Sequence, residues 1–158
     1  MKVAVLTTVF PRWEGDFFGN YIYHHAEAHV ESGADVRVVA PHAPGARTRE
    51  EINRVRVERF RYGLPASTQT IAYGGGVLAQ LERGWLAKLL FPVFMLSFFV
   101  KSMGVVRWAD IVHVHWTLAG FIGLALDYEN QPELTDERIA TWVQQLGVEF
   151  GLVRTTDQ

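Results

Sequence analysis

The sequence predicts an α/β fold in which helices cover both faces of a mainly parallel sheet. One continuous apolar run, residues 3–6, is typical of a central parallel strand, because such strands are covered on both faces, and a second strand is predicted at 35–40, where Pro41 ends it. A helical pattern over about 18–32 separates the two strands with short connections. This order predicts a strand–helix–strand unit with a right-handed crossover. A third strand is predicted at 110–116, where apolar residues alternate with His113 and His115.

Composition limits the class of protein. The chain has 158 residues, enough for one domain with a core, and its 49% hydrophobic and 20% charged residues are typical of a globular protein. A net charge of −2 does not indicate the excess of basic residues that nucleic-acid binding requires. The absence of cysteine excludes disulfides and thiolate metal sites. The first eight residues lack a small-residue cleavage site and indicate a strand, not a signal peptide, so we expect a cytoplasmic protein.

The region 78–103 is helical in pattern but contains Pro92, which has no amide hydrogen. We therefore expect one helix ending near Leu90 and a second over 91–103. The uncharged stretch 89–100 has 12 residues, whereas a membrane span needs about 20. The second helix is apolar almost all round, which predicts core packing; contact with lipid or a lipid-linked substrate is the alternative.

A half-buried strand is predicted at 54–60, after a loop at 41–49. The change of parity between Val57 and Phe60 predicts a bulge or a strand end near Glu58. Basic residues recur here, and we expect a solvated face balanced by glutamates; a phosphate contact is the alternative. The basic residues are Arg54, Arg56, Arg59 and Arg61.

A domain boundary is expected at Asp127. Residues 127–158 hold seven acidic and two basic side chains, unlike residues 1–126. A helix capped by Thr135 and a short strand after Gly147 are predicted in this acidic tail. The chain is therefore divided into a Rossmann-like domain, 1–126, and an atypical acidic tail, 127–158.

The loop after the first strand is the first candidate for a binding site. Gly15 and Gly19 are separated by three residues and do not form G-x-G-x-x-G, and no P-loop motif occurs, so a small nucleotide-binding protein is disfavoured. Two interpretations remain open. The loop and the following helix N-terminus could hold an anion or sugar hydroxyls, or the two glycines could simply make the turn.

The carboxyl end of strand 110–116 is the second candidate, because ligands bind at that end of the strands in open α/β sheets. His113 and His115 point to the same face. We expect His113 in the core and His115, the more accessible of the two, in a pocket. Trp116 could stack on a sugar or only pack. No metal site is predicted, because no third ligand lies nearby in sequence, and His24, His25 and His29 are expected to have surface or packing roles.

Four segments carry a resemblance to a known family: residues 3–11, the loop 15–19, residues 33–41 and residues 109–116. In their order and spacing they resemble the N-terminal, acceptor-side domain of a family-4 glycosyltransferase of GT-B architecture. The resemblance implies retaining transfer of a sugar from a nucleotide-sugar donor to a sugar or lipid-linked acceptor. It implies no metal and no cofactor.

By this resemblance the loop and the strand end border the acceptor, while the catalytic residue stays unknown. The implied substrate-binding residues are Gly15, Asp16, Phe17, Gly19, Asn20, His115 and Trp116. The family's next His-containing strand and its donor domain are not found after Leu126. We therefore expect a truncated chain that is inactive alone. A cytoplasmic location is expected, and peripheral contact at the inner face of the membrane is the alternative. The alternative function is that of a non-catalytic binding or scaffolding fragment that pairs with another chain.

Overall fold

The computed structural model describes residues 1–130, with side chains placed through Leu126. By its internal contacts the chain divides into two compact units, Met1–Leu126 and Asp127–Gln158. The fold is that of the first unit. The helix and strand predicted within the acidic tail lie outside the described residues.

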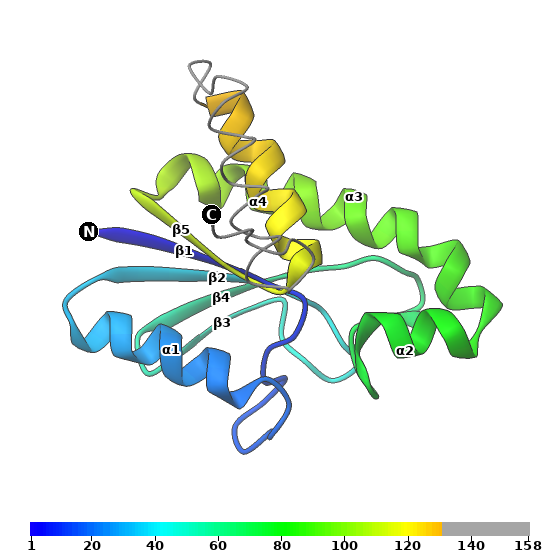
Figure 1. Ribbon diagram of the computed structural model, residues 1–158. Helices are drawn as coiled ribbons and strands as arrows, with labels where there is room; N and C mark the ends of the chain where they lie inside the picture. Colours follow the sequence, from blue (N-terminus) through cyan, green and yellow to red (C-terminus); the bar gives the residue numbers. More distant parts are fainter. Residues whose placement is uncertain (131–158) are drawn as a thin grey trace, which may run out of the picture. The chain divides into compact units, whose positions relative to one another are not determined.

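Five strands form one sheet in the order β3-β4-β2-β1-β5 (Figure 1). All neighbours pair parallel except β3 and β4, which are antiparallel. The predicted three-layer α/β fold with a mainly parallel sheet is therefore confirmed. The strands are β1 (Lys2–Thr7), β2 (Asp35–Pro41), β3 (Arg49–Ile52), β4 (Val55–Phe60) and β5 (Ile111–His115).

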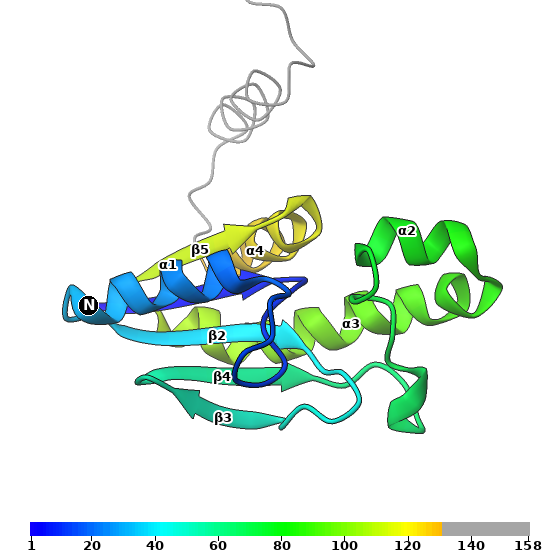
Figure 2. The same cartoon turned by 90° about the horizontal axis from the view of Figure 1, so that it is seen from below.

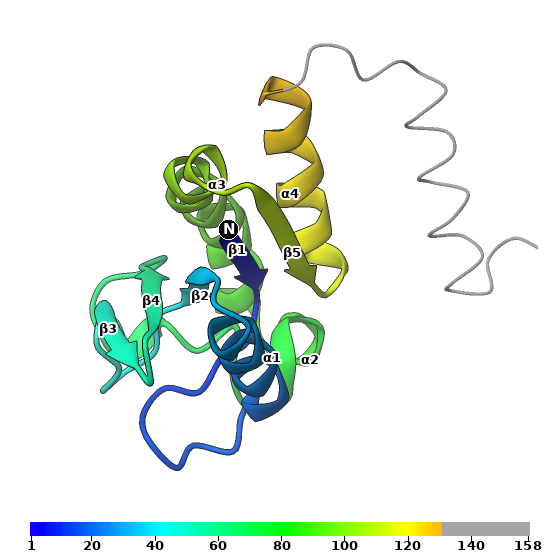
Figure 3. The ribbon, with the colours of Figure 1, turned by 90° about the vertical axis from the view of Figure 1, so that its left-hand side faces the viewer.

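Helices cover both faces of this sheet. Helix α1 (Asn20–Glu31) lies on one face, while α3 (Trp85–Trp108) and α4 (Thr117–Asn130) lie on the other (Figures 2 and 3). Helix α4 packs closely on β5 at Gly123, because a Cβ added to Gly123 would lie only 2.8 Å from a Val114 methyl carbon. A 3₁₀ turn (Ala66–Thr68) and α2 (Gly76–Arg83) connect β4 to α3.

The core beneath α3 is aromatic. The ring of Phe60 on β4 stacks on Phe98 with centroids 4.7 Å apart, and its edge meets Phe94 at 5.1 Å. Tyr62 closes the group against Phe94 at 4.9 Å. Phe94 and Phe98 are fully buried, which confirms the predicted core role of their helix face.

The predicted break near Leu90 is wrong, because α3 runs through Pro92 for 24 residues and the break falls at Gly84. Pro92 removes the bond to the carbonyl of Lys88, and both residues are exposed, so water can solvate that carbonyl. By length and composition alone, α3 could cross a membrane. One side of it nevertheless packs in the core.

The strand pair β3–β4 also departs from prediction. The sequence predicts a loop at 41–49 and no strand before residue 54, whereas Arg49–Ile52 form β3 and pair with β4. Strand β4 pairs with β2 residue by residue through Phe60, without the predicted bulge. No bulge is needed because β4 is covered on both faces, so Val57 and Phe60 are both buried on opposite sides. Arg59 is buried rather than solvated: its Nη2 donates to Glu50 Oε1 at 2.6 Å.

Candidate functional site

The loop between β1 and α1 is held closed by an ion pair. Asp16 Oδ2 accepts hydrogen bonds from Arg12 Nε at 2.7 Å and from the Arg12 amide at 2.9 Å. Its Oδ1 accepts from Arg12 Nη2 at 3.0 Å and from the Phe18 amide at 3.2 Å. The hydrogen bond from the Arg12 side chain lowers the pKa of Asp16 to about 2. Both carboxylate oxygens therefore serve the loop itself.

The glycines in this loop make its turns. Gly15 and Gly19 have φ of +83° and +78°, in the left-handed region that disfavours side chains. Gly19 also caps α1, and its carbonyl accepts from the amides of Ile22 and Tyr23. The Asn20 amide bonds to Phe17 O. The turn interpretation of the glycines has direct geometric support, while few first-turn amides remain for an anion.

A cavity of about 520 Å³ lies between this loop and the β3–β4 hairpin. Gly15, Asp16 and Asn20 line it, together with Arg47 and Glu50. Phe17 is 88% exposed and is not among the lining residues. Of the predicted loop residues, Gly15, Asp16 and Asn20 thus border the cavity, whereas Phe17 and Gly19 do not.

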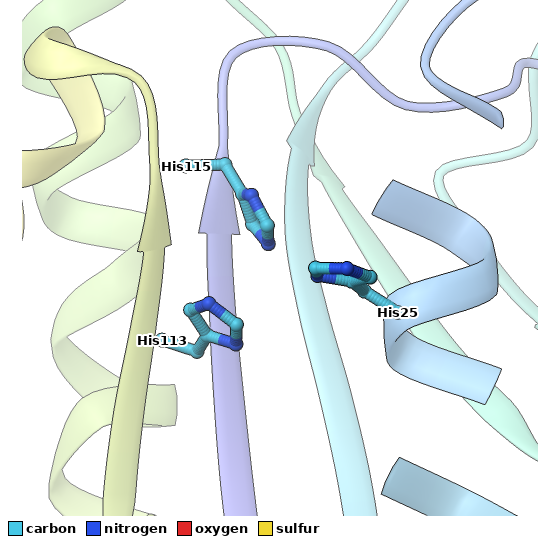
Figure 4. Close-up of side chains that lie close together, drawn as sticks. All are labelled: His25, His113 and His115. Carbon is cyan, nitrogen blue, oxygen red and sulfur yellow. The ribbon is translucent and has the colours of Figure 1, made fainter. Parts of the chain in front are cut away.

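The end of β5 builds a second group of side chains. In the parallel pairing of β1 and β5, Val5 lies opposite His113 and Thr7 opposite His115. Both imidazoles face α1, as their two-residue spacing predicts. His25 of α1 points toward them, and its ring centroid lies 6.1 Å from His113 and 5.7 Å from His115 (Figure 4).

The rings of His113 and His115 are both half-buried. Within the part of the chain that the structure describes, His115 Nε2 is a buried nitrogen without a hydrogen-bond partner. Burial, followed by the neighbouring imidazoles, lowers the pKa of His115 to about 4. Burial also lowers the pKa of His113. Because both rings are half-buried, the greater accessibility expected of His115 stays a prediction. The ring of Tyr21 on α1 packs 6.2 Å from that of His115.

Trp116 directly follows β5 and has an unusual backbone conformation. Its φ is +76°, which is a genuine outlier for a bulky residue. The side chain is 55% exposed and its ring lies 6.5 Å from that of Tyr21. Strain of this kind persists only where surrounding structure holds it, and it concentrates at binding sites.

The predicted site residues thus fall into two groups on either side of α1. Asn20 and Tyr23 line the loop cavity, while Tyr21 and His25 contact the β5 group. His115 and Trp116 do not line that cavity. Trp116 is predicted to lie near the loop 15–20. Its ring contacts Tyr21, which is the first residue after that loop.

Sequence reasoning missed the helix side of the β5 group. Tyr21, His25 and His29 are spaced by four residues and form one stripe along α1. This spacing was visible in the sequence. What was not visible was that the stripe would meet β5, because β5 is more than 80 residues away.

Comparisons with known proteins give a fold and a short sequence match. No protein-family model matches the sequence. Sucrose-phosphate synthase from Thermosynechococcus elongatus has a similar fold, with a TM-score of 0.51 and 17% identity, over 82% of this chain and 30% of that one. At this identity the likeness concerns the fold alone.

The sequence matches are to flavodoxins. That of Synechococcus elongatus is 66% identical over 32 residues, covering 20% of this chain and 19% of the flavodoxin. That of Klebsiella pneumoniae is 34% identical over 77 aligned residues, covering 35% of this chain and 43% of the flavodoxin. The chain thus spans about a fifth of the cyanobacterial flavodoxin and less than half of the Klebsiella one.

Proposed function

We propose that residues 1–126 act as the acceptor-side domain of a glycosyltransferase. The observation that carries the proposal is the group at the end of β5: a strained, half-exposed Trp116 beside Tyr21 and His115. Ligands of open α/β sheets bind at the carboxyl ends of the strands. The fold likeness to sucrose-phosphate synthase, a glycosyltransferase of GT-B architecture, supports this assignment.

The side chains at this end suit a sugar. Trp116 and Tyr21 meet edge to face and offer aromatic surface for the apolar face of a pyranose ring. His115 carries an unpartnered buried nitrogen that can accept or donate one hydrogen bond to a hydroxyl. A neutral imidazole suits this task because it keeps one donor and one acceptor. These three residues are the acceptor contacts we propose, with the loop cavity as a neighbouring polar surface.

The donor belongs to another domain or chain in this proposal. The sequence has no phosphate-binding glycine motif, and transfer requires both sugars in reacting geometry. A retaining reaction from a nucleotide sugar to a sugar or lipid-linked acceptor is the form we propose. The described domain would supply the acceptor half of that geometry and would be inactive alone.

A cytoplasmic location with peripheral membrane contact accompanies the proposal. The side of α3 away from the core exposes a stripe of large apolar residues at helical spacing. Its members are Trp85, Leu86, Leu89, Val93, Leu96 and Val100. Such a stripe can lie in a lipid interface while the opposite face stays packed on the sheet. A lipid-linked acceptor would then be reached from the bilayer surface.

The rival proposal is a non-catalytic fragment that pairs with another chain. Among the described strands, β5 lies at the edge of the sheet and pairs with β1 alone. Ile111 and Phe121 near this edge are 48% and 63% exposed. An open edge with apolar neighbours can template a further strand. Concentration-dependent association, measured by analytical ultracentrifugation, would favour this rival.

The flavodoxin match bears on the tail. We infer that the 32 aligned residues are those of the acidic tail, because Asp127–Gln158 has the same length and begins where the composition changes. Joining of two unrelated coding segments, by fusion or frameshift, would explain that change. A fifth of a flavodoxin provides no basis for assigning flavodoxin activity to this chain.

A saccharide titration tests the proposed function. Tryptophan fluorescence of the purified chain is followed against a panel of mono- and disaccharides, with Trp116→Ala as the test variant. The control is Trp85→Ala, since Trp85 is 75% exposed on α3. We expect a saccharide response that Trp116→Ala abolishes and Trp85→Ala preserves. A response unaffected by Trp116→Ala, or turnover of nucleotide sugars by the chain alone, would contradict the proposal.

A further inference from the structure

Four of the six histidines gather where α1 meets β5. The ring centroids of His113 and His115 are 4.5 Å apart, and His25 lies about equally close to both. One nitrogen from each of these three rings lies within 4.8 Å of the others. His29 Nε2 lies 3.3 Å from His113 Nδ1. Figure 4 shows the three rings converging from the two elements.

Sequence periodicity and sheet topology together produce this cluster. The two-residue spacing places His113 and His115 on one face of β5, and the four-residue spacing places His25 and His29 on one face of α1. Because β5 pairs with β1, the side chains on one face of β5 meet the helix α1 that covers that face of the sheet. Three ligands on two well-formed elements make a more rigid site than a loop would.

The histidine rings of this cluster have fewer hydrogen-bond partners than buried core histidines normally have. Among residues 1–126, no side chain or backbone group bonds the buried His115 Nε2, and burying such a nitrogen costs free energy unless something binds it. No carboxylate contacts the three rings among the interactions of the described residues. Imidazole binds a metal ion through an unprotonated ring nitrogen, and each of the three rings brings one nitrogen to the cluster.

We propose that His25, His113 and His115 bind one divalent transition-metal ion, with Zn²⁺ the first candidate. Imidazole nitrogens suit Zn²⁺, Cu²⁺, Ni²⁺ and Co²⁺, whereas Mg²⁺ and Ca²⁺ prefer oxygen ligands. Three imidazoles leave a fourth position for water, which is the composition of an open zinc site.

The geometry needs a small adjustment. Bonds of 2.0–2.1 Å in a tetrahedral site set the nitrogens about 3.4 Å apart, so the 4.8 Å spread must contract by roughly 1.4 Å. His25 is exposed on α1, and rotation of its side chain can supply this contraction without moving the sheet. The exposure of His25 also provides an entry path for the ion.

His29 completes the site as an outer partner. Ligating histidines commonly bond through their second ring nitrogen to another group, which fixes the orientation of the ring. The contact between His29 Nε2 and His113 Nδ1 does this and leaves His113 Nε2 for the ion. His29 is therefore a positioning residue, while His25, His113 and His115 are ligands.

Titration of the tag-free chain with ZnCl₂ in a calorimeter tests the proposal, with the thermal midpoint followed in parallel. The test variant is His25→Gln, an exposed position whose replacement leaves the core unchanged. The matched control is His24→Gln, on the same helix but outside the cluster, where its ring contacts Asn20 and Glu27. Circular dichroism confirms that each variant is folded.

We expect one Zn²⁺ per chain, a raised thermal midpoint, and binding weakened at least about 100-fold by His25→Gln. His29→Gln should weaken it about tenfold, and His24→Gln less than twofold. Co²⁺ in place of Zn²⁺ should give the visible absorption of a tetrahedral site. Absence of saturable binding, or equal binding by His25→Gln and the unaltered chain, would overturn the proposal. His115 belongs to both proposals, but this titration contains no sugar, so its result is read separately from the saccharide titration that tests the proposed transferase function.

Discussion

Gly19 approaches the backbone of Phe10 so closely that a Cβ on Gly19 would lie 3.0 Å from the Phe10 Cα. Its φ of +78° is also a conformation that side chains disfavour. This contact holds the start of α1 against the segment that directly follows β1. Both candidate groups depend on it, because α1 carries residues of each.

Replacing Gly19 by Ala should therefore destabilise the domain by about 2–4 kcal/mol, from left-handed strain plus the backbone clash. Gly15→Ala is the matched control. It has a similar φ but nothing within 4 Å of its added Cβ, so a cost of about 1–2 kcal/mol is expected. Urea unfolding of both variants checks this. Equal costs would show that the approach to Phe10 is not tight in solution.

The two faces of α3 should respond differently to truncation. Phe98→Ala removes a fully buried ring that stacks on Phe60, and should cost about 3–5 kcal/mol. Leu96→Ala, at a position 64% exposed, should change stability by about 0.5 kcal/mol or less. Thermal and urea unfolding measure both. A large loss from Leu96→Ala would mean that this stripe is covered in solution.

The same stripe can be tested against lipid. Leu89→Glu and Leu96→Glu place charges on the exposed face without touching the core. We expect the unaltered chain to sediment with anionic phospholipid vesicles and the double variant to remain in solution. Sedimentation that is equal for both proteins would remove α3 as the membrane contact.

Acid should weaken the loop through Asp16. Its folded pKa of about 2 lies below the ordinary value of 3.8, so the ion pair stabilises the fold fully above pH 3.8. This contribution, about 1–2 kcal/mol after allowance for solvent screening, is lost as the pH falls from 3.8 toward 2. Asp16→Asn should lose the stability at neutral pH and show less pH dependence in that window. Glu14→Gln, an exposed neighbour in the loop, is the control for unfolding measurements.

His115 should titrate at low pH in chain kept metal-free by a chelator. Burial, followed by the imidazoles of His113 on β5 and of His25 and His29 on α1, lowers its pKa to about 4. Tyr21 of α1 packs against the same ring. Below pH 6.5 the unfolded chain takes up a proton that folded His115 refuses, so stability falls between pH 6.5 and about 4 and then levels. The imidazole Cε1 proton signal followed by NMR measures this. Titration at 6.5 or above would show that the ring is open to water.

Local patterns in the sequence determined the elements and their layering. A continuous apolar run predicted β1, a valine-rich segment ended by a proline predicted β2, and four-residue periodicity predicted α1, because burial on a strand or a helix imposes its own spacing on the residues. The β5 segment and the common face of His113 and His115 followed in the same way. The glycine turns of the first loop were also visible, although their φ values were not.

Tertiary structure alone decided where distant elements meet and which polar groups they bury. Arg59 was predicted to be solvated, yet β3 folds back and supplies Glu50 as its partner. Pro92 was predicted to break a helix, yet packing of Phe94 and Phe98 on the sheet keeps it continuous. His25 joins His113 and His115 only because β5 pairs with β1 beneath α1. Such pairings join residues far apart in the chain, and their energy comes from packing that no local pattern records.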